Sequence, residues 1–300
     1  MHSVARVPDI ACEVCGGTAI PWRRIAGHDH FRCRVCRHLF VYPRPRQEEL
    51  DRFYGNPEYY TLASAQETRL HFEATARARL LSQVAADLGL GKRVLDVGCA
   101  TGIFLAAMHS EGWSASGVER SAGTAQLARG RLAGPVYDGL IEEMDVPGRP
   151  FDAVTAWEVL EHAANPAALM SALVQNVTPG GLIALSTPRS DGIPARVMGE
   201  RFPMICPPEH LSLFSRESLI RMARFHGLQI IHYSSFSNLT SASLASGLSK
   251  RLWGKDIRAI GAARRTLLRG AGFAATWAPW LIDRAGLGTE MQFILRAPSA

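Results

Sequence analysis

A short glycine-containing segment, Asp96-Val97-Gly98-Cys99-Ala100-Thr101-Gly102, follows an apolar stretch of the chain and could bring backbone close to a bound ligand. An acid, Glu119, closes the next apolar stretch, residues 114–119. An acid about 20 residues after a glycine loop accepts hydrogen bonds from ribose hydroxyls in nucleotide-binding α/β proteins. The dehydrogenase fingerprint G-x-G-x-x-G fails, because Ala100 and Ile103 stand where it needs glycine. The pattern therefore predicts a ribose-containing ligand but does not choose among cofactors.

A second group of chemically active residues is the run Glu158-Val159-Leu160-Glu161-His162. If a helical turn begins there, spacings of three and four place Glu158, Glu161 and His162 on one face. Two carboxylates and an imidazole suit a divalent cation, and His210 is expected above the same edge of the fold. Three interpretations stay open: a Mg²⁺ or other divalent cation held by these four residues, His162 or His210 as a general base without metal, or a structural pair.

Two C-x-x-C pairs, Cys12–Cys15 and Cys33–Cys36, flank a hairpin-length insert. Four thiolates at this spacing complete a tetrahedron, and Gly16-Gly17 can take the backbone conformations that the turn needs. We therefore expect a structural zinc ribbon, with two disulfides or unrelated thiols as the alternative. Four sulfur ligands leave no open position for water, so this metal is not expected to be catalytic. Cys99 is expected to be a small packing residue, and nothing in the pattern assigns Cys206.

The elements that would position these residues alternate along the chain. Helices are predicted within residues 47–90, at 103–108, 121–132 and 166–177, and from Ser215 to Gly227. Strands are predicted at residues 93–97, 114–119, 135–137, 151–157, 181–186, 228–233 and 291–295. This alternation predicts an α/β fold with a doubly wound, mostly parallel sheet, which binds ligands beyond the carboxyl ends of its strands.

Three segments of this chain resemble motifs of class I S-adenosylmethionine-dependent methyltransferases. Residues 94–102 resemble the first motif, Phe151-Asp152-Ala153-Val154 with the Glu158–His162 run resembles the fourth-strand motif, and residues 178–182 resemble the turn before the fifth strand. The resemblance covers about residues 91–188. It implies a Rossmann-like sheet of seven strands, the last of which, residues 291–295, would lie antiparallel beside the fifth.

The resemblance also implies roles for single residues. The methionine part of S-adenosylmethionine would lie against Asp96 and the loop, the ribose against Glu119, and the adenine between Leu140 and Ile141, where many relatives carry an acid. The predicted cofactor-binding residues are Asp96, Gly98, Cys99, Ala100, Gly102, Glu119, Leu140, Ile141 and Trp157.

The Glu-x-x-Glu-His run is similar to that of two methyltransferase groups. One group contains the ubiquinone-biosynthesis O-methyltransferases. The other contains small-RNA 3′-terminal 2′-O-methyltransferases, in which the run and a later histidine ligate a metal that would lower the pKa of a substrate hydroxyl. The resemblance therefore implies catalytic roles for Glu161, His162 and His210.

The predicted domains are a zinc ribbon at 1–45, a helical cap or linker at 46–90 and a methyltransferase domain at 91–300, with a helical insert at about 238–288. The insert carries many basic residues. It could form a lid over the active site, pack a dimer or lie on an anionic membrane, and a solvated basic face would equally account for its charges.

Composition sets the remaining limits. Hydrophobic residues make up 47% of the chain and charged residues 20%, which favours a packed core over disorder. The net charge of +6 favours anionic partners, although the arginines are spread along the chain. The N-terminus lacks the apolar core of a secretory signal, and the charge-free apolar stretch 270–282 is shorter than the roughly 20 residues of a membrane span. We therefore expect a cytoplasmic protein with reduced thiols.

These observations favour methyl transfer to a small molecule, with a hydroxyl of a sugar, lipid-linked or secondary-metabolite intermediate as the expected acceptor. Two other hypotheses remain. An RNA methyltransferase would fit the ribbon and the basic charge, but the chain lacks the interleaved aromatic and basic strand pattern of single-strand RNA binders. The other is a non-catalytic nucleotide-binding protein of the same fold, against which the intact loop and Glu119 argue.

Overall fold

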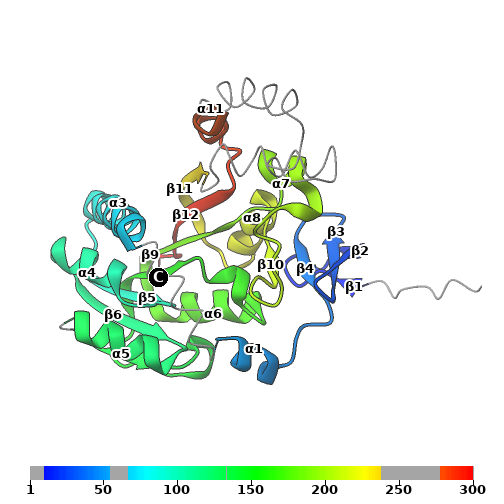
Figure 1. Ribbon diagram of the computed structural model, residues 1–300. Coiled ribbons are helices and arrows are strands. Elements are labelled where there is room, and N and C mark those ends of the chain that lie inside the picture. The colour runs from blue at the N-terminus through cyan, green and yellow to red at the C-terminus, as the bar shows by residue number, and fades with distance from the viewer. Residues whose placement is uncertain (1–9, 55–66, 133, 238–277, 300) are drawn as a thin grey trace, which may run out of the picture. The chain divides into compact units, whose positions relative to one another are not determined.

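The computed structural model describes residues 10–54, 67–132, 134–237 and 278–299 (Figure 1). The chain divides into two compact units, each built from separate stretches of sequence. Unit 1 comprises residues 1–44, 187–221 and 233–292, and unit 2 comprises residues 45–186, 222–232 and 293–300. The predicted domain boundaries at 45 and 90 stay a prediction.

A seven-stranded sheet confirms the predicted fold class. Its strand order is β11 (Gln229–Phe236), β12 (Glu290–Arg296), β9 (Val177–Pro188), β8 (Phe151–Trp157), β5 (Arg93–Val97), β6 (Ser114–Glu119) and β7 (Val136–Asp138). The pairs β9–β8, β8–β5, β5–β6 and β6–β7 are parallel.

Strand β12 lies between β9 and β11, as the family resemblance implied. Beyond its end, Ala297 donates a backbone hydrogen bond to Gly181, and Gly180 donates one to Pro298. Positions therefore descend in β9 as they rise in β12, which is the antiparallel arrangement. Strand β9 begins at Val177, earlier than the predicted Gly181, because Val177 already pairs with Phe151 of β8.

Helices of unit 2 pack against the strands of the same unit. Figure 1 shows α3 (Glu67–Asp87), α4 (Ile103–Ser110) and α5 (Ala122–Arg131) lying together. Their apolar side chains join those of the strands in one buried cluster, in which Leu81 and Leu105 are fully enclosed. Removing such side chains from water is the main stabilising contribution to the fold.

Side chains at the helix starts satisfy backbone donors that would otherwise lack partners. The hydroxyl of Ser121 accepts a hydrogen bond from Thr124 N at the start of α5, as predicted. Asn165 does the same for Ala168 N at the start of α6 (Pro166–Asn176), where Pro166 occupies the first turn. Helix α6 contacts β8, and residues 158–165 connect the two elements.

Unit 1 contains a second, five-stranded sheet of order β1 (Ile10–Ala11), β2 (Thr18–Ile25), β3 (His28–Cys33), β4 (Leu39–Val41) and β10 (Ser212–Leu213). Neighbouring strands of this sheet pair antiparallel. The first four strands come from the predicted ribbon, and β10 adds a strand from far along the chain. Helix α7 (Ile193–Met198) and the 3₁₀ turn Gly199–Arg201 follow β9 and pack on the same sheet through Met198 and Leu39.

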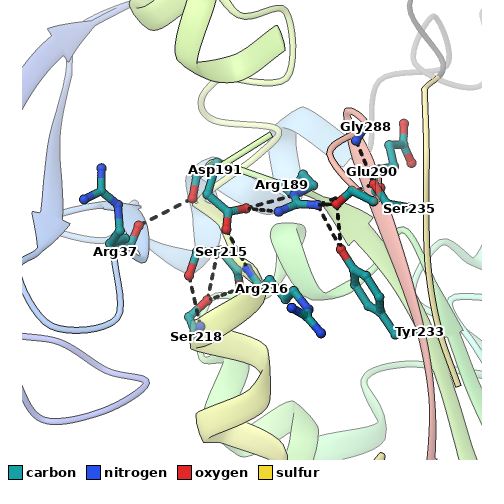
Figure 2. A network of polar contacts seen from close by, with 12 residues as sticks. Arg37, Arg189, Asp191, Ser215, Arg216, Ser218, Tyr233, Ser235, Gly288 and Glu290 are labelled. Atoms are coloured by element: carbon teal, nitrogen blue, oxygen red, sulfur yellow. Dashed lines mark hydrogen bonds and ion pairs between the residues drawn. The ribbon is translucent and has the colours of Figure 1, made fainter. Parts of the chain in front are cut away.

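A buried arginine of unit 1, Arg189, joins three separate segments of that unit through its hydrogen bonds. Arg189 is 2% exposed, and Figure 2 shows it between Asp191 on one side and Tyr233 and Ser235 on the other. Its Nε lies 2.8 Å from Asp191 Oδ1, and its Nη1 donates to the hydroxyl of Tyr233 at 2.8 Å and to the carbonyl of Gly286. A buried charge needs this degree of pairing, since an unpaired one would carry a large desolvation penalty.

Most of the predicted basic insert lies outside the described residues, because the structure describes only Ala278 onward, where α11 (Ala278–Arg284) precedes β12. Within the described part of the chain, no helix is both long enough and apolar enough to span a bilayer.

Candidate functional site

The glycine loop of unit 2 leaves β5 and turns back over β6. Backbone N–H groups of Gly98 and Cys99 both donate to Val118 O, at 2.8 and 3.1 Å. Gly98 has a φ of 69°, and a Cβ placed on it would lie 2.6 Å from Val159 Cγ2. Glycine is therefore required here on two grounds, the left-handed backbone and the close approach of Val159.

Glu119, at the end of β6, is hydrogen-bonded to this loop. One carboxylate oxygen accepts from Ala100 N at 3.0 Å and the other from Ser121 N at 2.9 Å. The side chain is only 8% exposed, and burial raises the pKa of this carboxyl. Each carboxylate oxygen can accept a second hydrogen bond, so the group can still bind the two hydroxyls of a ribose.

Asp96 lies one layer deeper and is 2% exposed. Its Oδ1 accepts a short hydrogen bond of 2.6 Å from the Thr155 hydroxyl. Burial raises the pKa of Asp96 to about 7, with the charge of Glu119 adding to the rise and the Thr155 bond and Arg77 opposing it. Asp96 therefore titrates near neutral pH beneath the loop. Glu119, in contrast, lines the cavity beside the loop.

A cavity of about 270 Å³ opens beside the loop and Glu119. Six of the nine predicted cofactor-binding residues line it: Gly98, Ala100, Glu119, Leu140, Ile141 and Trp157. The other three, Asp96, Cys99 and Gly102, do not. Gly102 precedes the first residue of α4, and Cys99 is buried in the core cluster. Burial raises the pKa of the Cys99 thiol, which agrees with its predicted packing role.

The end of β8 contributes Trp157 to the lining of the cavity. The indole of Trp157 lies between Phe104, at a ring distance of 5.3 Å, and the Arg77 guanidinium, 4.8 Å from the ring centre. The buried Nε1 of Trp157 has no hydrogen-bond partner among the described residues. Glu158 has a φ of 55° and forms an ion pair of 3.7 Å with Arg77. An unpaired donor and a strained residue are both features that accompany binding sites.

The Glu-x-x-Glu-His run does not form one helical face. Its only turn, the 3₁₀ turn Leu160–His162, begins after Glu158. Glu161 is fully buried and does not line the cavity, although its Oε1 lies 3.8 Å from His162 Nε2. His162 lines the cavity, and its Nδ1 lies 2.9 Å from the hydroxyl of Tyr54, in α1 (Gln47–Tyr54). The imidazole is thus contacted at both ring nitrogens.

Sequence reasoning missed Tyr54, Arg77 and Arg120. Tyr54 and Arg120 line the cavity, with the guanidinium carbon of Arg120 5.1 Å from the centre of the Tyr54 ring. Tyr54 is the last residue of α1, and no motif of the sequence includes it. Arg77 lies in α3, within the region 47–90 that was predicted to be helical. It shares the spacing of about 3.6 residues with the apolar Ala74 and Leu81, which was the available signal.

His210 belongs to unit 1, where its Nδ1 lies 2.8 Å from Met204 O and its ring neighbours Cys206 and Glu209. Its joint action with Glu161 and His162, as a base or in a cation site with Glu158, stays a prediction.

The four ribbon cysteines come together as predicted. Their sulfurs lie within 4.8 Å of one another, with Cys12 Sγ 3.6 Å from Cys36 Sγ and Cys15 Sγ 3.5 Å from Cys33 Sγ, and none forms a disulfide. Zn–S bonds of about 2.3 Å separate tetrahedral sulfur ligands by about 3.8 Å. The cluster therefore fits a structural zinc ion, held by Cys12, Cys15, Cys33 and Cys36.

Comparison with known proteins supports the assignment of the fold and of the cofactor loop to a methyltransferase. A family described as a methyltransferase domain matches residues 69–233, more than half of the chain. The ubiquinone biosynthesis O-methyltransferase of Thiobacillus denitrificans is 34% identical over 152 residues, which cover 46% of this chain and 65% of the relative. Its namesake from Pseudomonas aeruginosa is 42% identical over 108 residues, covering 32% of this chain and 44% of the relative. The chain thus matches less than two thirds of the length of these relatives.

A solved methyltransferase from Archaeoglobus fulgidus, described as dependent on S-adenosylmethionine, shares the fold. It superimposes with a TM-score of 0.52 and 19% sequence identity, covering 79% of this chain and 99% of that one. At this identity the likeness concerns the fold alone.

Proposed function

Because the chain belongs to the class I S-adenosylmethionine-dependent methyltransferases, we propose that it transfers a methyl group from S-adenosylmethionine to a hydroxyl of a small molecule. A sugar, a lipid-linked intermediate or a secondary-metabolite intermediate is the acceptor class we favour. The observation that carries the proposal is the fixed carboxylate of Glu119 at the wall of a cavity that His162 also lines. O-methylation is supported by the names of the curated relatives.

The cofactor fits residues on this wall. Gly98 leaves open the space that a side chain would fill, and Glu119 presents acceptor positions for two hydroxyls. Leu140 and Ile141 supply an apolar surface for a purine, and Trp157 adds to the lining of the same cavity. When bound, S-adenosylmethionine supplies a methyl group on a positively charged sulfur that departs as a neutral thioether.

The chain itself has to position the acceptor, exclude water and remove a proton. Apolar side chains of Val97, Val159 and Leu169 line the cavity and limit the access of water. His162 would accept the proton of the acceptor hydroxyl at Nε2, while Nδ1 keeps its hydrogen bond to Tyr54, as the oxygen bonds to the methyl carbon. Tyr54 and buried Glu161 would act as positioning residues, since each contacts one nitrogen of the ring.

A methyl-transfer assay tests this proposal. Protein, methyl-deuterated S-adenosylmethionine and a panel of phenolic and sugar hydroxyl acceptors are incubated, and products are identified by mass spectrometry. We expect an O-methylated product, and we expect His162→Gln to lower kcat by about 100-fold or more. Tyr54→Phe should shift the pH profile of kcat, because it changes the partner of the imidazole. Full turnover by His162→Gln would contradict the role of His162.

Exposed Glu143, which does not line the cavity, provides the control variant. Glu143→Gln should leave both kcat and the pH profile unchanged. If it lowered turnover as much as His162→Gln, the loss would reflect general damage to the fold instead of lost proton transfer.

A further inference from the structure

Unit 1 contains a separate cavity of about 430 Å³, which lies within the size range of small-molecule sites. Its lining is dominated by guanidinium groups, which come from the ribbon strands and from the segment after β9. The five arginines are Arg23, Arg32, Arg37, Arg196 and Arg201. Only two carboxylates, Asp191 and Glu200, line the same cavity.

Both carboxylates are already paired. Glu200 accepts from Arg23 Nε at 3.0 Å. Asp191 accepts from the buried Arg189, which is not part of the cavity lining, and also from Arg216 N (Figure 2). Neither acid is therefore left to neutralise the remaining arginines of the lining.

Arg32 and Arg37 are two of the four remaining arginines of the lining. Neither has a carboxylate within ion-pair distance among the residues that the structure describes. Half-buried Arg32 stacks on Trp22, with its guanidinium carbon 4.6 Å from the ring centre, and experiences the repulsion of Arg37. Figure 2 shows the Arg37 side chain pointing away from the pair formed by Arg189 and Asp191.

The backbone at Arg37 gives a second, independent observation. The residue after each C-x-x-C pair donates its N–H back to the first cysteine: Gly16 to Cys12 O at 2.8 Å, and Arg37 to Cys33 O at 3.1 Å. Both residues are left-handed, with φ of 69° for Gly16 and 62° for Arg37. This conformation favours glycine, so the second knuckle carries an arginine at the expense of backbone strain.

We propose that this arginine-lined cavity binds the diphosphate group of a small anionic molecule. A guanidinium presents a planar fork of donors that matches phosphate oxygens. Several such forks lining one cavity suit a group with two linked phosphates better than a single carboxylate. A cavity of about 430 Å³ favours a small molecule over an extended nucleic-acid backbone. The site lies within unit 1 and does not depend on the proposed methyl transfer.

Calorimetric titration of the full chain with inorganic pyrophosphate tests the proposal. We expect saturable binding to the wild type and an affinity lower by about tenfold or more in Arg37→Gly, since a charge-assisted hydrogen bond is lost. Because glycine adopts the left-handed conformation without steric strain, the melting temperature of Arg37→Gly should equal or exceed that of the wild type. Lost binding in an equally stable variant separates a ligand role from a structural one.

Arg34→Gln is the matched control, because Arg34 is an exposed arginine of the same knuckle that does not line the cavity. It should bind pyrophosphate like the wild type. If Arg34→Gln and Arg37→Gly lost the same amount of pyrophosphate affinity, the loss would reflect the overall charge of the protein and would overturn the proposal.

A second titration uses adenosine diphosphate and a single-stranded RNA. Binding of adenosine diphosphate at least as tight as that of pyrophosphate, and weakened by Arg37→Gly, would support a nucleotide-linked ligand. Binding of RNA without binding of pyrophosphate would overturn the small-molecule assignment, as would the absence of pyrophosphate binding to the wild type at millimolar concentration.

Discussion

Replacing Asp96 with asparagine should stabilise the protein above neutral pH. Asp96 is almost fully enclosed, and its Oδ1 accepts a hydrogen bond from Thr155. An asparagine oxygen can accept the same bond and never ionises. The substitution therefore removes a buried negative charge while it preserves the local geometry.

The expected magnitude follows from proton linkage. The pKa of Asp96 is raised from 3.8 to about 7, so between these values the folded protein retains a proton that the unfolded chain releases. The free energy of unfolding must then fall as the pH rises from about 4 to about 7, by up to about 4 kcal/mol at about 1.4 kcal/mol per pH unit. Asp96→Asn lacks this contribution, so its advantage over the wild type should grow across that range and stay constant above it.

Urea unfolding of both proteins at a series of pH values from 4 to 8 measures this difference. Thr155→Val provides the opposing variant: without the hydroxyl that favours the ionised form, the loss of stability should extend to higher pH. In an Asp96→Asn background the Thr155→Val effect should not vary with pH. A stability difference between Asp96→Asn and wild type that is the same at pH 4 and pH 8 would refute the reasoning.

Three further predictions concern the metal, the core and the loop. Metal analysis should find one zinc per chain, lost in Cys33→Ser but retained in Cys206→Ser; equal zinc in both variants would contradict the ribbon assignment. Leu105→Ala should lower the free energy of unfolding by about 2–5 kcal/mol, measured by urea unfolding, because Leu105 is fully buried in the core. Gly98→Ala should weaken S-adenosylmethionine binding in calorimetry, whereas Gly123→Ala, where an added Cβ meets nothing within 4 Å, should not. Unchanged affinity in Gly98→Ala would mean that the loop does not contact the cofactor.

The sequence predicted the parts of the site that depend on local patterns. The apolar run of β5, the two glycines and the acid at 119 are encoded within about two dozen residues, and the structure places them as expected. The cysteine cluster was equally predictable, because the spacing of C-x-x-C pairs restricts where four sulfurs can lie.

Contacts that depend on packing between distant segments were not predictable in this way. The hydroxyl of Tyr54 reaches His162 across 108 positions of sequence, and no local pattern marks a tyrosine at a helix end as a partner for an imidazole. The left-handed backbone at Glu158 likewise ends the strand before the helical turn begins, which separates Glu158 from Glu161. Arg37 lies in a left-handed position that its residue type alone would not suggest.

Calorimetric titration with S-adenosylhomocysteine, comparing the wild type with Glu119→Gln, tests the central claim most directly. The account predicts one site per chain in the wild type and an affinity lower by about tenfold or more in Glu119→Gln, because hydrogen bonds to a charged acceptor are lost. The assignment of the loop and its acid would be contradicted if the wild type did not bind S-adenosylhomocysteine. It would also be contradicted if Glu119→Gln bound it as tightly as the wild type.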